Sequence, residues 1–200
     1  PGASECAVYA AMLGAMIERG GEVPAMIMWA AGAPERLLSS RPPTLRRFER
    51  GDFLRAEVEG RYAGYCGQVT QMAVLGPVPA PYREMWRLQQ EALALCCAEM
   101  RPGITLGELA QRTVAVGQGT SGRVRFLMHG RGLGDDAPMY AFSASAAAAD
   151  WPLEAGACFV AKPVVSREGH ADVVWGDSVV VTETGAQRLG TIPAEILELA

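Results

Sequence analysis

The sequence predicts an α+β domain that is built from two similar halves. Patterns typical of helices alternate with patterns typical of strands along all 200 residues. Half of the residues are hydrophobic and a fifth are charged, as expected for a chain with a globular core. The segment "PGAS" at 1–4 returns as "PGIT" at 102–105, and a helical pattern, a glycine-containing turn and a strand pattern follow each copy. We therefore expect a single domain over 1–200, with halves of about 1–100 and 101–200 related by a pseudo-twofold axis.

Helices are predicted in both halves. Ser4 is a typical N-cap, and the apolar residues after it recur on one face of a helix over 4–19. Thr105 and Glu108 have the spacing of a capping box, which opens another helix. Between these two we expect a long helix over 81–100, and the "EIL" near the end of the chain predicts a closing helical turn.

Strands are predicted where β-branched, aromatic and other apolar residues run between glycines and prolines. The segments concerned are 25–31, 51–76, 124–129, 157–165 and 172–182. Within 51–76 the sequence Gly-Arg-Tyr-Ala-Gly predicts a tight turn between two strands. We expect a loop over 33–50, and a loop or short helix near the entrance of a pocket over 143–150.

Charge and cysteine content exclude several classes of protein. The net charge of −4 and the pI of about 5.3 give no electrostatic reason to expect a nucleic-acid partner. The five cysteines lack Cys-x-x-Cys spacing, so we expect reduced thiols and a cytoplasmic protein. No apolar run approaches 18 residues, which predicts no membrane span. The chain opens on Pro1-Gly2, which leaves room for an upstream N-terminal domain.

A lysine interrupts one of the apolar strands. Lys162 stands in the middle of "CFVAKPVV", and a buried lysine without a partner costs several kcal/mol or loses its proton. At an offset of 105 the segment "GDFLRAEVE" matches "GACFVAKPV", so Glu57 is the counterpart of Lys162. We therefore expect these two side chains to face each other where the two halves meet, which is also a natural place for a pocket.

The sequence resembles the creatinase / aminopeptidase P / prolidase / methionine aminopeptidase family. The resemblance rests on "GDFLRAEVEGRYAGYCGQVTQMAVLGP", on "MHGRGLGDDAP", and on "GACFVAKPVV" and "GDSVVVTETGAQRL", which follow in the family's order and cover nearly all of the chain. It implies the pita-bread fold, in which two pseudo-twofold-related αβ halves share a curved, mainly antiparallel sheet.

The residues at the family's metal-binding positions differ from the family pattern. Active peptidases of the family hold two divalent metals with two aspartates, one histidine and two glutamates. In this chain the aligned positions carry Glu57, Gln68, His129, Lys162 and Gly176. The family's substrate-side histidines fall near Ser39 and Asp136. Only the histidine ligand is kept, and Glu57 is a conservative replacement.

These replacements predict that no catalytic metal and no other cofactor is bound. A di-metal site needs anionic oxygens, whereas Gln68 is neutral, Gly176 has no side chain and Lys162 is cationic. An ammonium 4 Å from a divalent ion is repelled by about 8 kcal/mol at an effective dielectric constant near 20.

Our first hypothesis is a metal-independent hydrolase of a C–N bond in a small amino-acid-derived substrate, as the resemblance to creatinase implies. His129 would be the acid/base, and Glu57 a second acid/base, a nucleophile or a cation-binding carboxylate. Lys162 would bind a substrate carboxylate or stabilise an oxyanion, Gln68 would orient polar atoms, and Arg131 would clamp a carboxylate. The expected partner is a small amino-acid derivative or a short peptide.

Two other functions stay open. A pita-bread domain that has lost its catalysis would bind a peptide, a metabolite or a protein, and a metal-dependent Xaa-Pro peptidase is the third alternative. Lys162 and Glu57 would then be only a buried ion pair that takes over the structural role of the metal. Relatives with an N-terminal domain are often homodimers, so a homodimer is possible here.

Several other residues have a functional and a structural interpretation. Asp135 and Asp136 look like a metal pair, but adjacent acidic residues more often cap a turn. His170 is expected on the surface, and Cys66 and Cys158 are expected to pack rather than react with His129. Two tryptophans are candidates for either the pocket or the core, namely Trp29 and Trp175.

Overall fold

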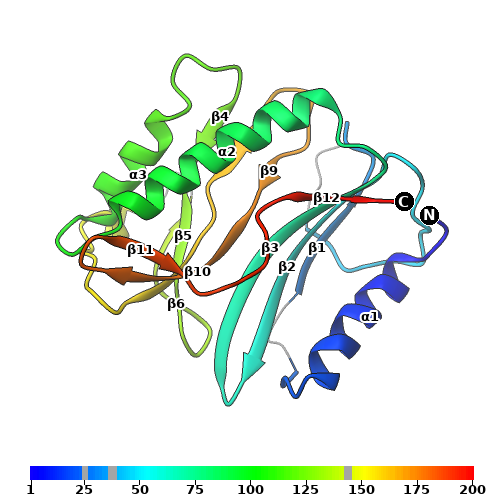
Figure 1. Ribbon diagram of the computed structural model, residues 1–200, viewed down its shortest axis with the longest axis horizontal. Helices are drawn as coiled ribbons and strands as arrows, with labels where there is room; N and C mark the ends of the chain where they lie inside the picture. The colour runs from blue at the N-terminus through cyan, green and yellow to red at the C-terminus, as the bar shows by residue number, and fades with distance from the viewer. Residues whose placement is uncertain (24–26, 36–39, 142–145) are drawn as a thin grey trace.

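The computed structural model describes residues 1–23, 27–35, 40–141 and 146–200, and has the predicted α+β architecture (Figure 1). Its helices are α1 (Glu5–Glu18), α2 (Ala80–Glu99), α3 (Leu106–Ala115) and α4 (Ala146–Ala149). Its strands in the first half are β1 (Ile27–Gly32), β2 (Phe53–Tyr62) and β3 (Tyr65–Leu75). The second half holds β4 (Arg123–Arg125), β5 (Leu127–Arg131), β6 (Asp135–Ala141), β7 (Cys158–Ala161), β8 (Val164–Ser166), β9 (Val173–Val174), β10 (Gly176–Thr182), β11 (Gly185–Arg188) and β12 (Ile196–Leu199).

The order of strands in the main sheet reflects the internal repeat. The sheet runs β1-β2-β3-β10-β7-β5-β6, and each of these neighbours pairs antiparallel. The first three strands of one half are therefore mirrored by β10, β7 and β5 of the other half, with the junction between β3 and β10. This arrangement confirms the two pseudo-twofold-related halves and the curved antiparallel sheet. A smaller sheet has the order β4-β8-β9.

The helices begin where the capping residues predict. The Ser4 hydroxyl accepts a hydrogen bond from the Ala7 amide at 3.2 Å, and Thr105 and Glu108 form the reciprocal capping box. In Figure 1, α2 and α3 lie together over one part of the sheet, whereas α1 lies at the opposite end, close to both chain termini.

Three apolar clusters hold these layers together. The largest joins α2 and α3 to β5, β7 and β10 through residues such as Leu109, Met128 and Phe159. The second joins α2 to the smaller sheet and to the ends of β2 and β3. The third lies between α1 and the first three strands and is centred on Trp29. Because Trp29 and Trp175 are both buried in these clusters, they belong to the core.

The turn between β2 and β3 is shorter than predicted. The strands pair up to Tyr62 and Tyr65, so the turn consists of Ala63 and Gly64. Both residues have positive φ, 49° and 80°, which is the backbone of the two-residue turns that match the twist of an antiparallel pair. Gly60, Arg61 and Tyr62, predicted in the turn, therefore belong to β2.

The prediction of a closing helical turn at "EIL" is wrong. Residues Ile196–Leu199 form β12, which pairs parallel with β3 from Met72 to Leu75. The paired residues of β10 and β3 are only Gly176 and Asp177 with Thr70 and Val69, so β12 takes the part of the β3 edge that follows. Backbone pairing and the burial of Ile196 outweigh the local preference of three residues for a helix.

Three further segments differ from their predictions. The strand predicted over 157–165 is divided at Lys162-Pro163, because proline cannot donate to a ladder, and β7 and β8 belong to different sheets. The strand predicted over 172–182 is divided at Trp175 into β9 and β10. The strand predicted over 124–129 is divided at Phe126 into β4 and β5, which belong to different sheets. In the part of the chain that the structure describes, no helix is long and apolar enough to cross a membrane.

Candidate functional site

The polar residues of the site lie on the sheet face opposite the first and third apolar clusters. Side chains alternate between the two faces of a strand, so Ala56 and Met128 enter the apolar clusters while their neighbours Glu57 and His129 point the other way. Side chains of the first and second halves meet there in one set of contacts, which we call the charged network. It consists of Glu57, Glu59, Gln68, His129, Arg131, Asp135 and Lys162.

Lys162 and Glu57 meet across the junction, as the repeat predicts. The Lys162 ammonium donates to Glu57 Oε2 in a short ion pair, and the two side chains are 5% and 12% exposed. Lys162 directly follows β7, where its own amide donates to the Leu127 carbonyl at 3.0 Å. The buried ammonium therefore has the carboxylate partner that a low-dielectric site requires.

Gln68 connects this ion pair to the rest of the network. Its Nε2 donates to Glu57 Oε2 at 2.9 Å, and its Oε1 accepts a short hydrogen bond from Arg131. A carboxylate in this place could only accept, whereas an amide joins an anion on one side to a cation on the other. This geometry gives a physical reason for glutamine where the family resemblance implies an aspartate.

Arg131 is held by side chains from three other strands. Its NH1 donates to Glu59 Oε2 at 2.6 Å and its NH2 donates to Asp135 Oδ1 at 2.6 Å, in addition to the bond to Gln68. The Arg131 side chain is 1% exposed. Two carboxylates of the chain itself thus occupy the fork that was expected to clamp a substrate carboxylate. The Arg131 Nε has no hydrogen-bond partner among the described residues.

His129 is buried with one ring nitrogen fixed. Its Nδ1 lies 3.0 Å from the Gly130 carbonyl oxygen and 3.4 Å from Asp135 Oδ1. Because a carbonyl can only accept, Nδ1 carries the hydrogen and Nε2 carries the lone pair. Burial is the main reason that the pKa of His129 is lower than its usual value, and the positive charges of Lys162 and Arg131 lower it further. The Gly130 carbonyl and the Asp135 carboxylate raise the pKa, but they do not cancel this decrease. The ring is therefore neutral at pH 7.

Gly176 leaves no space for a metal-binding side chain. A Cβ added there would lie 2.3 Å from the Lys162 Cβ and 2.6 Å from the Ala161 carbonyl oxygen, both far too close. At the other positions, Glu57 is paired with Lys162, and Gln68 uses its only acceptor on Arg131. Among the described residues, no group of three or more His, Cys, Asp or Glu is arranged to hold a metal ion. The residues present do not fit a pair of divalent metals.

The remaining candidates lie at the edge of the network or outside it. Asp136 accepts from the Leu133 amide at 3.1 Å and so caps the turn between β5 and β6. His170 Nδ1 lies 2.9 Å from the Glu168 carbonyl oxygen, to which it can only donate, and His170 lies outside the network. Cys66 Sγ contacts the Leu133 carbonyl at 3.6 Å. Ser39 lies outside the described residues.

Two members of the network were not predicted from the sequence. Glu59 was not considered, and Asp135 was considered only as part of a metal pair or a turn. Glu59 stands two residues after Glu57, so strand alternation alone would have placed it on the same face. Asp135 stands four residues after Arg131, but its contact with His129 depends on how β6 folds back, which the local sequence does not determine.

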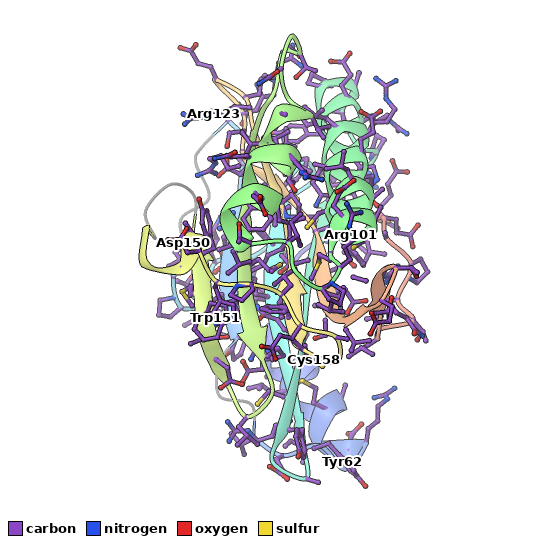
Figure 2. All side chains as sticks on the ribbon, turned by 90° about the vertical axis from the view of Figure 1, so that its left-hand side faces the viewer. Tyr62, Arg101, Arg123, Asp150, Trp151 and Cys158 are labelled. Atoms are coloured by element: carbon purple, nitrogen blue, oxygen red, sulfur yellow. The ribbon has the colours of Figure 1, made fainter. Side chains whose placement is uncertain are left out.

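Two cavities reach Arg131 from the solvent. One, of about 520 Å³, is lined by Arg131 together with Trp151, Pro152, Cys158 and Phe159. The other, of about 720 Å³, reaches both Arg131 and Gln68. In Figure 2, Trp151 and Cys158 lie on the side that faces the viewer, above the hairpin tip that Tyr62 marks. The network is thus buried but has open space at one end.

Comparisons with known proteins agree with the fold and the family resemblance. The model of metallopeptidase family M24 matches residues 1–183. The chain is 28% identical over 206 residues to dimethylsulfoniopropionate lyase DddP of Roseovarius nubinhibens, covering 95% of this chain and 44% of the lyase. It is 26% identical over 204 residues to the uncharacterized peptidase YqhT of Bacillus subtilis, covering all of this chain and 56% of that protein.

A solved structure of similar shape is the X-Pro aminopeptidase of Thermotoga maritima, with a TM-score of 0.85 and 24% identity over 99% of this chain and 56% of that chain. This likeness confirms the pita-bread fold. The chain spans about half the length of the curated relatives it matches, 44% and 56% of the two described above.

Proposed function

We propose that this chain, which belongs to metallopeptidase family M24, is a hydrolase that works without a metal ion on a C–N bond of a small amino-acid-derived substrate. One observation carries the proposal. A neutral imidazole, held at Nδ1 and without a hydrogen bond at Nε2 among the described residues, stands beside an ammonium–carboxylate pair at the family's metal positions. A base and a fixed positive charge are the two things that the metal supplies in hydrolysis.

The proposed roles follow from these groups. His129 Nε2 takes a proton from a water molecule, whose oxygen attacks the carbon of the C–N bond. The Lys162 ammonium has three donors, so it keeps Glu57 on one and offers another to the oxyanion that forms. When the C–N bond breaks, the proton on His129 passes to the departing nitrogen, which leaves as an amine and restores the neutral imidazole.

A small substrate is favoured over a peptide for two reasons. The network is nearly closed, with the Lys162 and Arg131 side chains 5% and 1% exposed. One of the similar proteins is named as a lyase of dimethylsulfoniopropionate, a small charged molecule, which is evidence that the family scaffold accepts such compounds. The peptidase names among the relatives support hydrolysis of a C–N bond.

A catalytically inactive binding domain is the second candidate. It is favoured by the fact that the charged groups pair mainly with each other, since Arg131 alone meets Glu59, Asp135 and Gln68. In a binding domain, this network would hold the two halves together and take no part in a reaction. The binding surface would then lie at one of the cavities that reach Arg131.

The test is a hydrolysis screen of N-acyl, amide and amidine derivatives of amino acids and of dipeptides, run with and without EDTA. Amine release that EDTA leaves unchanged and His129→Ala abolishes supports the proposal. Activity that appears only after addition of manganese or zinc would contradict it. Saturable binding of a compound without turnover would favour the binding domain.

A further inference from the structure

We propose that Asp135 is a positioning residue for His129 and that Arg131 holds Asp135 in that place. The proposal rests on the proposed function only for its catalytic consequence, because the positioning itself is a property of the fold. Neither residue stands at a position where the family resemblance implies a ligand.

The backbone brings Asp135 back towards His129. In the ladder between β5 and β6, His129 pairs with Met139, but the next residue, Gly130, pairs with Asp136, so the register shifts between them. An irregularity of this kind bends a strand and re-aims its side chains. It leaves Asp135 opposite Arg131 with its carboxylate 3.4 Å from His129 Nδ1.

One carboxylate oxygen serves both neighbours. Asp135 Oδ1 accepts from Arg131 NH2 at 2.6 Å and lies 3.4 Å from His129 Nδ1. The imidazole N–H therefore faces two acceptors, this oxygen and the Gly130 carbonyl, and both favour the hydrogen on Nδ1. Fixing that tautomer keeps the Nε2 lone pair available to take a proton.

Arg131 supplies the rigidity that Asp135 lacks. The Asp135 side chain is 35% exposed and would rotate freely on its own. Arg131 is buried and bound to Glu59 on β2 and to Gln68 on β3, so the position of its NH2 is set by the first half of the chain. A charge-assisted bond to this fixed guanidinium holds the carboxylate beside His129. The first half thus orients a base that the second half carries.

The test reads the tautomer of His129 directly, without a substrate. The chain has two histidines, so a sample with ¹⁵N-labelled histidine gives two imidazole spin systems, and His170→Gln assigns them. We expect the wild type to show His129 with Nδ1 protonated and Nε2 unprotonated. In Asp135→Ala the ratio of the Nδ1–H to the Nε2–H tautomer should fall about fivefold, because the charged oxygen 3.4 Å from Nδ1 is lost while the Gly130 carbonyl remains.

A matched control lies next to the test residue. Asp136→Asn removes an adjacent carboxylate that caps Leu133 but does not touch the ring, and should leave the tautomer ratio unchanged. If Asp135→Ala does not fold, Asp135→Asn keeps the shape and should still lower the ratio. An unchanged ratio in whichever Asp135 variant folds, or the same fall in Asp136→Asn, would overturn the proposal.

The outcome separates this inference from the proposed function. A shifted tautomer with no hydrolysis of any compound would uphold the positioning and reject the enzyme. If a substrate is found, Asp135→Asn should lower kcat about tenfold and change KM little, because a misplaced base affects the proton transfer more than binding. A rise in KM with unchanged kcat would instead place Asp135 in substrate binding and overturn its positioning role.

Discussion

The two buried cations of the site, Lys162 and Arg131, are held in different ways. Among the described residues, Lys162 has one carboxylate partner, Glu57, on the other half of the chain. Arg131 has two carboxylates and an amide, which come from three other strands. A cation with one partner can exchange that partner for a reacting group, whereas a cation bound on three sides stabilises the fold. Under the proposed function, Lys162 therefore takes part in the reaction, whereas Arg131 stabilises the fold.

The strongest test of this contrast is Arg131→Met. It removes the guanidinium that neutralises Glu59, whose side chain is 4% exposed, and leaves a buried carboxylate without its partner. We expect the free energy of unfolding to fall by about 3–5 kcal/mol, measured by urea denaturation. The double variant Arg131→Met/Glu59→Gln should recover much of this loss. A loss below about 1 kcal/mol would show that Arg131 contributes little to the stability of the fold.

Gly176→Ala tests how closely the two halves approach beside Lys162. The new methyl group would lie 2.3 Å from the Lys162 Cβ and 2.9 Å from its Cα, so the backbone must move. We expect a loss of about 1–3 kcal/mol in the free energy of unfolding. Gly134→Ala is a suitable control, since a Cβ at that glycine would meet nothing within 4 Å. Equal stability of the two variants would contradict the close approach.

Glu57→Gln should cost less than Arg131→Met, because the Glu57 side chain is 12% exposed and the Arg131 side chain only 1%. The change leaves the Lys162 ammonium without its carboxylate, and we expect a loss of about 1–3 kcal/mol. Pairing it with Lys162→Met removes both charges and should restore most of the stability. The coupling energy from this double-mutant cycle would be near zero if the side chains did not meet.

The smallest expected effect concerns acid stability. The pKa of His129 is lower in the folded protein than in the unfolded chain, so the unfolded chain binds the proton first as the pH falls. The neutral His129 ring makes its full contribution to the free energy of unfolding above pH 6.5, which is about the pKa of histidine in the unfolded chain. Below that pH the contribution is lost, at up to about 1.4 kcal/mol per pH unit. His129→Gln should flatten the curve of unfolding free energy between pH 7 and 5. A slope identical to that of the wild type would show that His129 titrates normally.

The repeat and the resemblance were sufficient to predict part of the site. Glu57 and Lys162 occupy equivalent places in the two halves, so their meeting across the junction followed from the sequence alone. The caps at Ser4 and Thr105 are short-range and were also predictable. The strand β12 and the closing of the network by Asp135 depend on contacts between distant segments, an open edge of β3 and a register shift in β6.

The close approach of Lys162 to Gly176 was unpredictable for a related reason. In the sequence it appears only as a lost ligand, but in the structure it makes room for the Lys162 side chain. The two positions are 14 residues apart in the chain and differ from the family pattern together. Their relation is a matter of packing, which one-dimensional patterns do not record.

The central claim is that side-chain charges, rather than metal ions, organise this site. The most direct measurement is the metal content of the protein by mass spectrometry, after incubation with manganese, cobalt and zinc and then desalting. We predict less than about a tenth of an equivalent of any of the three per chain, because a preformed set of anionic ligands is missing. One or two tightly held equivalents would contradict the claim, and would mean that Lys162 leaves Glu57 in solution.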